Sequence, residues 1–325
     1  DQRLAVQVAG QPMQQAQLAA ASFIGPLAPA AARASITFSF ATFEADPALV
    51  AGASSAGVPT LSGESAIVVD LDSKEVLYAK QPRKRQLMAS TAKIMTAIVA
   101  AEHSPLDKVI TVPPEATEVE PNHMGIQAGE QLTVQELLYG LLLDSGNDAG
   151  EAMAYGIGGG GAAGRAQFIR WMNDTAAALG LADTHFANPS GLDDPQQYST
   201  AYDLAVIGAY ALSKPELRQI FGTKDIVIHP SQEPGRDHGW FHPGNLNSLL
   251  STYRGAIGIK PGYTEDAGYT LVGAAERDGR TLVCVTLNSR RHFSDCAALL
   301  DFGFARATAQ AQATPTTPPA PDPYV

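Results

Sequence analysis

The sequence predicts an α+β protein, in which an antiparallel sheet takes strands from both ends of one folded region and helices lie between those ends. Strand-like runs occupy residues 66–71 and 75–79 near the start, and residues 256–260, 269–275 and 281–287 near the end. Apolar runs with helical spacing fill the segment between them. Strands so distant in sequence can share one sheet if the intervening helices flank it. We therefore expect a sheet with flanking helices and a second, mostly helical lobe.

Turn signals pair the strands into hairpins. A turn at Asp72 and Ser73 separates the first two runs, and the phrase RDGR at residues 277–280 separates the last two. An Asp-Gly pair between two strand-like runs is a strong hairpin signal, because both residues tolerate a positive φ. A closing helix is expected over residues 294–305.

Three capping signals mark helix starts in the middle of the chain. Each places a hydroxyl three residues before an acidic residue at the head of an apolar run: Thr133 with Glu136, Thr200 with Asp203, and Ser213 with Glu216. A further helix is expected from about residue 165, where apolar side chains recur at helical spacing. Residues 156–164 are dense in glycine but lack the Gly-Lys-Ser/Thr ending of a phosphate loop. They predict a flexible interhelical loop and not a nucleotide site.

Composition divides the chain into three parts. Residues 1–62 are rich in Ala, Gln, Ser, Gly and Pro, with one strand-like stretch at residues 35–43, and are expected to be an N-terminal tail or spacer. Residues 63–306 carry the strands and helices of the folded domain. Residues 307–325 repeat Thr and Pro, which favours an extended polyproline conformation in a C-terminal tail.

Length and charge limit the classes of function. The 325 residues are 45% hydrophobic and 17% charged, which allows a sizeable core. The formal charge of −11, from 22 basic and 33 acidic residues, argues against nucleic acid as a partner. No run approaches the roughly 20 apolar residues that span a bilayer, so no membrane association is visible in the chain. Residues 18–34 form only a weak candidate leader.

Neither a metal nor a cofactor is expected from the side-chain spacing. His238 and His242 lie four apart, but the glycine and proline around them prevent a helix that would present both rings on one face. The two cysteines, Cys284 and Cys296, make no disulfide framework. Two buried free thiols are the favoured interpretation, with a single bridge in an exported protein as the alternative.

The strongest sign of chemistry is the phrase STAK at residues 90–93, at the head of an apolar helical run. Positions i and i+3 share one face of a helix, so the Lys93 amine can lie beside the Ser90 hydroxyl. Lys93 is the only lysine in the chain with a serine three residues before it. Its pKa, about 10.4 in water, must be lowered by burial or by a neighbouring cation before the amine can act as a base at neutral pH.

Two further motifs follow in order. Ser145 lies two residues before Asn147, directly after the helical run 133–143, and therefore falls on an interhelical loop. Farther on, the phrase KPGYT at residues 260–264 ends the strand-like segment 255–260 and is expected to lead through a turn into the next strand. Ser-Gly-Asn is also ordinary turn chemistry, so that motif does not identify a site by itself.

Together the three motifs resemble those of the penicillin-recognising serine acyltransferases, in which Ser-x-x-Lys, Ser-x-Asn and Lys-Thr-Gly line one cleft. The chain looks most like the serine-type D-Ala-D-Ala carboxypeptidases, the low-molecular-weight penicillin-binding proteins of peptidase family S11. Longer phrases carry this likeness: MASTAKIMT at 88–96, LDSGNDA at 143–149, NPSGLD at 188–193 and YSTAYDL at 198–204. The resemblance runs from about residue 63 to residue 305 and implies a β-lactamase/transpeptidase-like fold.

The resemblance also implies roles for individual residues. The catalytic residues would be Ser90, Lys93, Ser145 and Asn147, and the substrate-binding residues would be Lys260, Gly262, Tyr263 and Thr264. Ser90 would be the nucleophile and Lys93 its base, assisted by the charge of Lys260, which would also attract the terminal carboxylate of the substrate. Ser145 would relay a proton to the leaving group, and Asn147 would hold the substrate backbone. The backbone amides of Ser90 and Tyr263 would form the oxyanion hole.

This chain departs from the family pattern at two positions. Pro261 stands where the family has a hydroxyl side chain, and Ala92 stands where threonine is frequent. Loss of the hydroxyl removes a hydrogen bond to the substrate carboxylate worth about 1.5 to 3 kcal/mol, and Thr264 is the candidate to replace it. Proline is tolerated on an edge strand, which suits a strand that pairs with substrate on its free side.

The resemblance implies an exported hydrolase, located in the periplasm, the cell envelope or outside the cell. It would remove the terminal D-alanine from peptidoglycan stem peptides and be acylated by β-lactam inhibitors, without a cofactor. A β-lactamase or a DD-endopeptidase of the same fold is the nearest alternative, although residues 173–260 contain no Glu-x-x-x-Asn phrase of the kind that supports deacylation in β-lactamases. A non-catalytic cell-wall-binding or assembly protein is the alternative of another class.

Overall fold

The structure, a computed structural model, describes residues 57–119, 121–233 and 236–313. The candidate leader at residues 18–34, the strand-like stretch at 35–43 and the proline-rich end from residue 314 lie outside the described residues.

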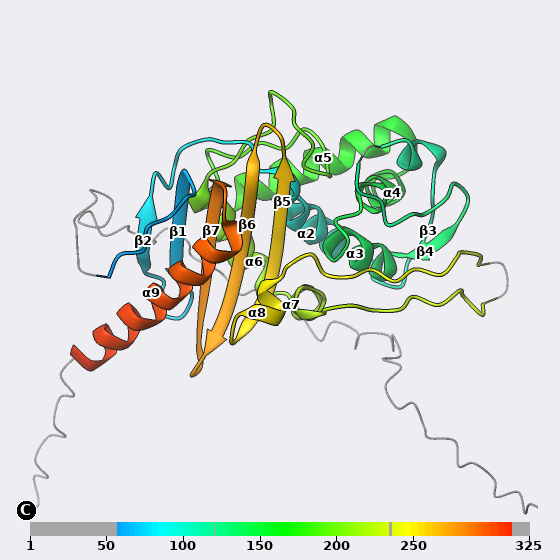
Figure 1. Cartoon of the computed structure of the whole chain (residues 1–325). Helices are drawn as coiled ribbons and strands as arrows, with labels where there is room; N and C mark the ends of the chain where they lie inside the picture. Colours follow the sequence, from blue (N-terminus) through cyan, green and yellow to red (C-terminus); the bar gives the residue numbers. More distant parts are fainter. Residues whose placement is uncertain (1–56, 120, 234–235, 314–325) are drawn as a thin grey trace, which may run out of the picture. The chain divides into compact units, whose positions relative to one another are not determined.

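A five-stranded antiparallel sheet organises the described region, in the order β2, β1, β7, β6, β5 (Figure 1). Its strands are β1 (Ser65–Asp70), β2 (Val76–Lys80), β5 (Ala256–Thr264), β6 (Gly268–Arg277) and β7 (Arg280–Ser289). β1 pairs with β7 from Ser65 opposite Leu287 to Asp70 opposite Leu282. The first and last parts of the domain therefore share one sheet, which confirms the prediction of strands from both ends.

Both predicted hairpins are present. β1 and β2 are antiparallel neighbours, with Ala66 opposite Lys80. β6 and β7 are joined by Asp278 and Gly279, whose φ angles are 53° and 75°. Two consecutive positive φ values belong to the tight turn whose twist matches that of the flanking strands.

Helix α9 (His292–Ala313) packs on β1, β6 and β7 and is the orange-red helix of Figure 1. Helix α6 (Ala201–Leu212) packs on the same strands from the other side. Gly303 of α9 lies against Leu282, whereas Gly208 of α6 lies against Val283. Successive residues of a strand point to opposite faces, so the two helices cover opposite faces of the sheet.

α9 is longer than the helix expected at residues 294–305, and it enters the segment assigned to the tail from residue 307. The alternating alanines of residues 305–313 explain the extension, because alanine has the highest helix propensity. The first proline after them is Pro315.

Cys284 on β7 and Cys296 on α9 form a disulfide, with their Cα atoms 6.0 Å apart. The favoured interpretation of two free thiols is therefore wrong, and the alternative of a single bridge is correct. The two residues are buried in the cluster between α9 and the sheet. They meet because α9 folds back on β7, and sequence spacing carries no information on that packing.

The second lobe is mostly helical (Figure 1). Its helices are α2 (Lys93–His103), α3 (Val134–Leu142), α4 (Asn147–Gly158) and α5 (Gly161–Ala178), accompanied by the two-stranded sheet of β3 (Val109–Thr111) and β4 (Gln131–Thr133). The remaining short elements are η2 (Ala89–Ala92), η3 (Pro114–Thr117), α7 (Pro215–Gly222) and α8 (Leu249–Thr252).

Two of the three predicted helix caps are observed. Thr133 and Glu136 form a reciprocal capping box at the start of α3, and the Thr200 hydroxyl accepts from the Asp203 amide at the start of α6. Ser213 does not cap α7, because its hydroxyl donates to a backbone carbonyl in the last turn of α6. That prediction is wrong because a serine between two helices can serve either end.

The glycine-dense stretch 156–164 is not a flexible loop. Only Gly159 and Gly160 separate α4 from α5, with φ angles of 111° and 89°. A side chain on Gly158 would clash with the backbone of Gly164. The glycines thus allow a sharp turn and a close helix contact, which corrects the expected loop.

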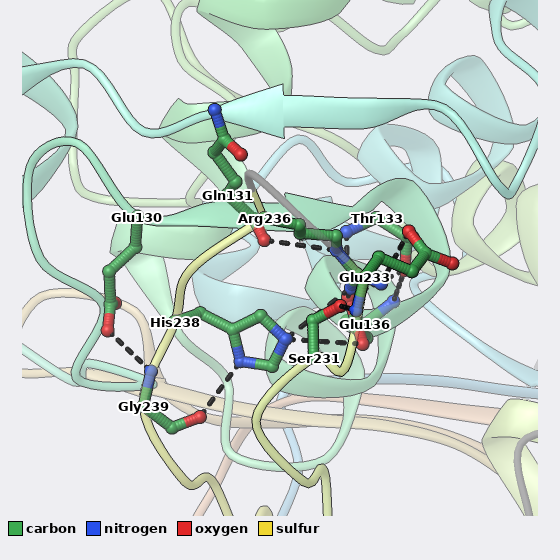
Figure 2. Close-up of polar contacts among 9 residues, drawn as sticks. All are labelled: Glu130, Gln131, Thr133, Glu136, Ser231, Glu233, Arg236, His238 and Gly239. Carbon is green, nitrogen blue, oxygen red and sulfur yellow. Dashed lines mark hydrogen bonds and ion pairs between the residues drawn. The ribbon is translucent and has the colours of Figure 1, made fainter.

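A long excursion, residues 223–248, leads from α7 to α8 and is anchored on the helical lobe. Figure 2 shows its outer contacts. The Arg236 guanidinium forms an ion pair with Glu136 of the capping box. The Gly239 amide donates to Glu130 Oε1 at 2.7 Å. These contacts fix the excursion to the residue before β4 and to the first turn of α3.

The two histidines of the excursion are separate. His238 is buried beside Glu136, 3.7 Å from its Oε1, whereas His242 is exposed and lies 3.7 Å from Asp225 (Figure 2 shows the first). Within the described ranges, no three His, Cys, Asp or Glu side chains gather as metal ligands. No helix in those ranges is long and apolar enough to cross a membrane.

Replacement of Arg236 by methionine should destabilise the protein by about 2 to 3 kcal/mol, because it leaves the nearly buried Glu136 carboxylate without its cation. Denaturant unfolding measures the change. Arg218→Met is the control, since Arg218 pairs with Glu276 in a half-exposed ion pair whose loss should cost less than about 1 kcal/mol. Equal losses in the two variants would contradict the prediction.

Candidate active site

The three motifs of the sequence meet where η2, the α3–α4 loop and β5 come together. Ser90 lies in η2, and Lys93 is the first residue of α2. Asn147 is the first residue of α4, two residues after Ser145 in the preceding loop. Lys93 Nζ contacts both Ser90 and Asn147, so the first two motifs touch directly.

Lys93 Nζ has three oxygen neighbours. It lies 3.1 Å from Ser90 Oγ, 2.6 Å from Asn147 Oδ1 and 2.5 Å from Ser190 O. The two carbonyl oxygens can only accept, so each uses one proton of the amine. A neutral amine has two protons and one lone pair, which leaves the lone pair for the Ser90 hydroxyl. This arrangement suits a serine whose proton is taken by lysine.

The surroundings of Lys93 favour its neutral form. Burial lowers the pKa of Lys93 well below its usual value, and the positive charge of Lys260 lowers it further. The carboxylates of Asp148 and Glu151 act in the opposite direction. Since burial is the largest effect, the net change is toward the neutral amine, the form that can act as a base.

The backbone before Ser90 is strained and firmly held. Ala89 has a φ of 47°, a conformation that costs a non-glycine residue on the order of 1 kcal/mol or more. The hydroxyls of Thr91 and Thr270 both donate to the Met88 carbonyl, at 2.6 and 3.1 Å. These bonds, one local and one from β6, stabilise the turn that presents the serine.

The loop before α6 supplies a partner that sequence reasoning missed, the carbonyl of Ser190. Asn188 shapes this loop, because its Oδ1 accepts from the Ser190 amide at 3.2 Å and from the Gly191 amide at 2.8 Å. Gly191 has a φ of 89°, and a side chain there would clash with the Ala89 carbonyl. The phrase NPSG is a turn signal in the sequence. Only the tertiary contact shows that the turn points a carbonyl at Lys93.

Ser145 and Asn147 differ in their contacts. The Asn147 side chain accepts from Lys93 through Oδ1 and donates to the Pro121 carbonyl through Nδ2, so it holds the lysine. Its contact with the substrate backbone stays a prediction. Ser145 has a φ of 63°, and its hydroxyl is buried with no hydrogen-bond partner among the described residues. An unpaired buried hydroxyl is uncommon, and the proton relay predicted for Ser145 would give it a partner during the reaction.

The third motif forms the end of β5. The strand continues through residues 260–264, each paired with β6, and the turn follows at residues 265–267. The predicted turn into the next strand is therefore confirmed, and the strand before it ends at Thr264 instead of Lys260. β5 is at the edge of the sheet among the described strands, so its outer side can pair with an added peptide and Pro261 is compatible with the strand.

Gly262 brings β5 against Ser90. A Cβ there would lie 2.7 Å from Ser90 N and 2.6 Å from Thr270 Oγ1, so only glycine permits the approach. The amides of Ser90 and Tyr263, which the resemblance assigns to the oxyanion hole, therefore belong to two segments in contact. The Tyr263 ring is exposed and packs on the Tyr269 ring, with centroids 4.5 Å apart.

Lys260 is a buried cation with few partners. Its Nζ donates to the Pro261 carbonyl at 3.1 Å. Burial lowers the pKa of Lys260 to about 7, against the opposing charge of Asp144. The Thr264 hydroxyl, the candidate to replace the missing one, donates its one proton to Asp193 Oδ1 at 2.9 Å. A contact of Thr264 with the substrate carboxylate would require this bond to break, and that contact stays a prediction.

Comparison with known proteins agrees with this geometry. A family profile described as D-alanyl-D-alanine carboxypeptidase matches residues 52–291. The chain belongs to this family. The D-alanyl-D-alanine carboxypeptidase DacB2 of Mycobacterium tuberculosis is 37% identical over 261 residues, which cover 78% of this chain and 86% of that relative. The D-alanyl-D-alanine carboxypeptidase of Streptomyces sp. strain K15 is 34% identical over 258 residues, which cover 76% of this chain and 89% of that relative.

A solved structure of a relative shows the same architecture. The crystal structure of the Streptomyces K15 DD-transpeptidase matches with a TM-score of 0.71 and 34% identity, and the match covers 76% of this chain and 98% of that one. This likeness confirms the predicted fold class of a D-alanyl-D-alanine carboxypeptidase, an antiparallel sheet flanked by helices.

A Gly262→Ala variant should acylate with benzylpenicillin at least roughly 100-fold more slowly, because the added methyl group displaces Ser90 from β5. Intact-mass measurement of the adduct over time gives the rate. Gly244→Ala is the control, since an added Cβ there meets nothing within 4 Å. Normal acylation of Gly262→Ala would show that the close approach is not required.

For a peptide with a free terminal carboxylate, kcat/KM should decline as the pH rises through the pKa of Lys260, about 7. The ammonium form, present below this pKa, attracts the carboxylate, and the neutral amine above it does not; kcat/KM reports the groups of the free enzyme. The same peptide with a terminal amide is the control and should lack this alkaline decline. Identical profiles for the two peptides would mean that Lys260 does not recognise the carboxylate.

Proposed function

We propose that this protein removes the terminal D-alanine from peptidoglycan stem peptides through an acyl-enzyme on Ser90, and that β-lactams acylate the same serine. The observation that carries the proposal is the buried Lys93 amine, 3.1 Å from Ser90 Oγ, with its other contacts to two carbonyl oxygens. Membership of the D-alanyl-D-alanine carboxypeptidase family supports the substrate class. Relatives of that name at 37% and 34% identity support it further.

Acylation begins when Lys93 takes the proton of Ser90 Oγ as this oxygen attacks the penultimate carbonyl of the peptide. The carbonyl oxygen becomes negative and is stabilised by the amides of Ser90 and Tyr263. The C–N bond then breaks, and the departing amine of D-alanine receives the proton from Lys93 through the Ser145 hydroxyl. In deacylation a water molecule attacks the ester, its proton passes to Lys93, and Ser90 Oγ recovers a proton as it leaves.

Recognition of the substrate carboxylate depends mainly on Lys260. Pro261 has no hydroxyl to donate, and the Thr264 hydroxyl is engaged with Asp193. We therefore propose that this chain binds a free terminal carboxylate less strongly than a protein with threonine at position 261.

A Pro261→Thr variant should raise kcat/KM for a carboxylate-ended peptide about 10-fold, because one hydrogen bond to a charged group contributes about 1.5 kcal/mol. Steady-state release of D-alanine measures the effect. The matching peptide amide is the control and should gain little. An equal gain for both peptides would assign the effect to the strand backbone and not to the carboxylate.

Related reactions share the first step. Transfer of the acyl group to an amine, or cleavage of a cross-link by a DD-endopeptidase, differs only in the acceptor or the leaving group. The Streptomyces K15 relative carries both names, carboxypeptidase and DD-transpeptidase. A β-lactamase is disfavoured because residues 173–260 lack a Glu-x-x-x-Asn phrase. A purely wall-binding role is disfavoured by the contact of Lys93 with both Ser90 and Asn147.

We also propose that the protein acts outside the cytoplasm, in the periplasm, the cell envelope or the medium. The Cys284–Cys296 disulfide supports this location, because such bonds persist in oxidising compartments. Peptidoglycan as substrate requires the same location. The formal charge of −11 supports the absence of nucleic acid among its partners.

Incubation with benzylpenicillin followed by intact-mass analysis tests the proposed nucleophile. We expect a stable adduct on the unmodified protein and none on Ser90→Ala, and release of D-alanine from a D-Ala-D-Ala peptide should be lost in the same variant. Ser251→Ala, at an exposed serine of α8, is the control and should form the adduct normally. Rapid turnover of penicillin would favour the β-lactamase, and neither adduct nor turnover would favour the wall-binding alternative.

A further inference from the structure

A buried carboxylate follows the second motif directly. Asp148 is next to Asn147 and is 1% exposed. Its Oδ1 accepts from the Met124 amide at 2.8 Å, and its Oδ2 accepts from the Gly125 and Ile126 amides at 2.8 and 3.2 Å. Among the described residues, no ion pair joins Asp148 to a cationic side chain. Backbone amides therefore stabilise this carboxylate.

The segment that Asp148 binds, residues 121–126, has an irregular course. Asn122 and Gly125 have φ angles of 62° and 92°, and neither a helix nor a strand includes them. Three consecutive amides of the segment converge on one carboxylate, as they do in an anion-binding nest. Without the carboxylate these amides would lose their acceptor, and the segment would change its shape.

This segment orients the Asn147 side chain. Asn122 O accepts from the Asn147 backbone amide at 2.8 Å, and Pro121 O accepts from the side-chain Nδ2. A carbonyl cannot donate, so Pro121 selects the orientation in which Asn147 Oδ1 faces Lys93. Oδ1 then binds one amine proton at 2.6 Å, and the lone pair of the amine remains for Ser90.

We propose that Asp148 is a positioning residue for acyl transfer at Ser90. It holds residues 121–126 in the shape that orients Asn147. Through Asn147 it directs the Lys93 amine toward the nucleophile. The inference rests on the proposed function, because it concerns the rate of that chemistry. Asp148 also lies in the first turn of α4, where a carboxylate interacts favourably with the helix dipole. That interaction does not require contact with residues 121–126.

Asp148 also acts on the charge of Lys93. The charged groups that face this amine are Lys260 from β5, which lowers its pKa, and Asp148 and Glu151 from α4, which raise it. Glu151 is itself paired with Arg165. Removal of the Asp148 charge therefore lowers the pKa of Lys93. The decrease in acylation rate on the acid side of the pH profile, the acid limb, then occurs at lower pH. A residue that served only the stability of the fold would not move this limb.

The test compares Asp148→Asn with Asp295→Asn. Asp295 is a matched control, because it is 2% exposed and accepts from the Ser62 and Gly63 backbone amides at 3.0 and 2.9 Å. It belongs to α9, on the other face of the sheet. The rate of acylation by benzylpenicillin is measured across the acid and neutral pH range. Asp148→Asn should slow acylation roughly 10- to 100-fold and shift the acid limb to lower pH. Asp295→Asn should lose thermal stability with rate and profile unchanged.

The Gly125→Ala variant tests the shape of residues 121–126 separately from the charge of Asp148. Its φ of 92° disfavours any side chain, while the added Cβ meets nothing within 4 Å, so the change acts on the backbone of the segment and leaves Asp148 charged. We expect slower acylation with an unmoved acid limb. If Asp148→Asn does not fold, Gly125→Ala alone tests the proposal.

Three results would overturn the proposal: full-rate acylation of folded Asp148→Asn, full-rate acylation of folded Gly125→Ala, or a rate loss in Asp148→Asn with an unmoved acid limb. The last result would assign Asp148 to the fold alone. Acylation of the unmodified protein and of Asp295→Asn shows separately that the proposed serine chemistry is present. Absence of acylation in every form would mean that the serine chemistry itself is missing.

Discussion

The burial of the Lys93 amine is the constraint on which the rest of the site depends. A protonated ammonium is costly to bury without a counter-ion, and Lys93 forms no ion pair within the described part of the chain. Its close neighbours are the hydroxyl of Ser90 and the carbonyl oxygens of Asn147 and Ser190. The neutral form is therefore favoured, and a neutral amine beside a serine hydroxyl is a base. Because Asn147 and Ser190 come from distant segments, this base exists only in the folded protein.

Unusual backbone conformations maintain this arrangement. Ala89 and Ser145 have φ angles of 47° and 63°, and Gly191 and Gly262 allow approaches that a side chain would block. The positive φ angles of Ala89 and Ser145 cost stability, on the order of 1 kcal/mol or more each, and persist only in rigid surroundings. The sheet supplies that rigidity, because η2 packs against both β5 and β6. The strained positions lie beside the nucleophile and in the motif loop, where a fixed geometry serves the reaction.

Much of the fold could be predicted from the sequence, and two of the errors have a common cause. The two hairpins and the Thr133 capping box depend on a few neighbouring residues, and the structure contains them. The bridge between Cys284 and Cys296 and the tight turn in place of a flexible loop at residues 156–164 were predicted wrongly. Each of these depends on which surfaces of the fold meet, so local patterns of glycine or cysteine did not determine it.

For the site, the sequence by itself determined which groups are candidates. The i, i+3 spacing places Lys93 beside Ser90, and the order of the three motifs identifies the family. Only the tertiary structure decided how those groups are arranged. It engages the Thr264 hydroxyl with Asp193, turns the Asn147 amide toward Lys93, and adds the Ser190 carbonyl that no motif indicates. The physical reason is that spacing along the chain decides only contacts between near neighbours. Burial, charge and the orientation of an amide depend on segments that meet when the whole chain folds.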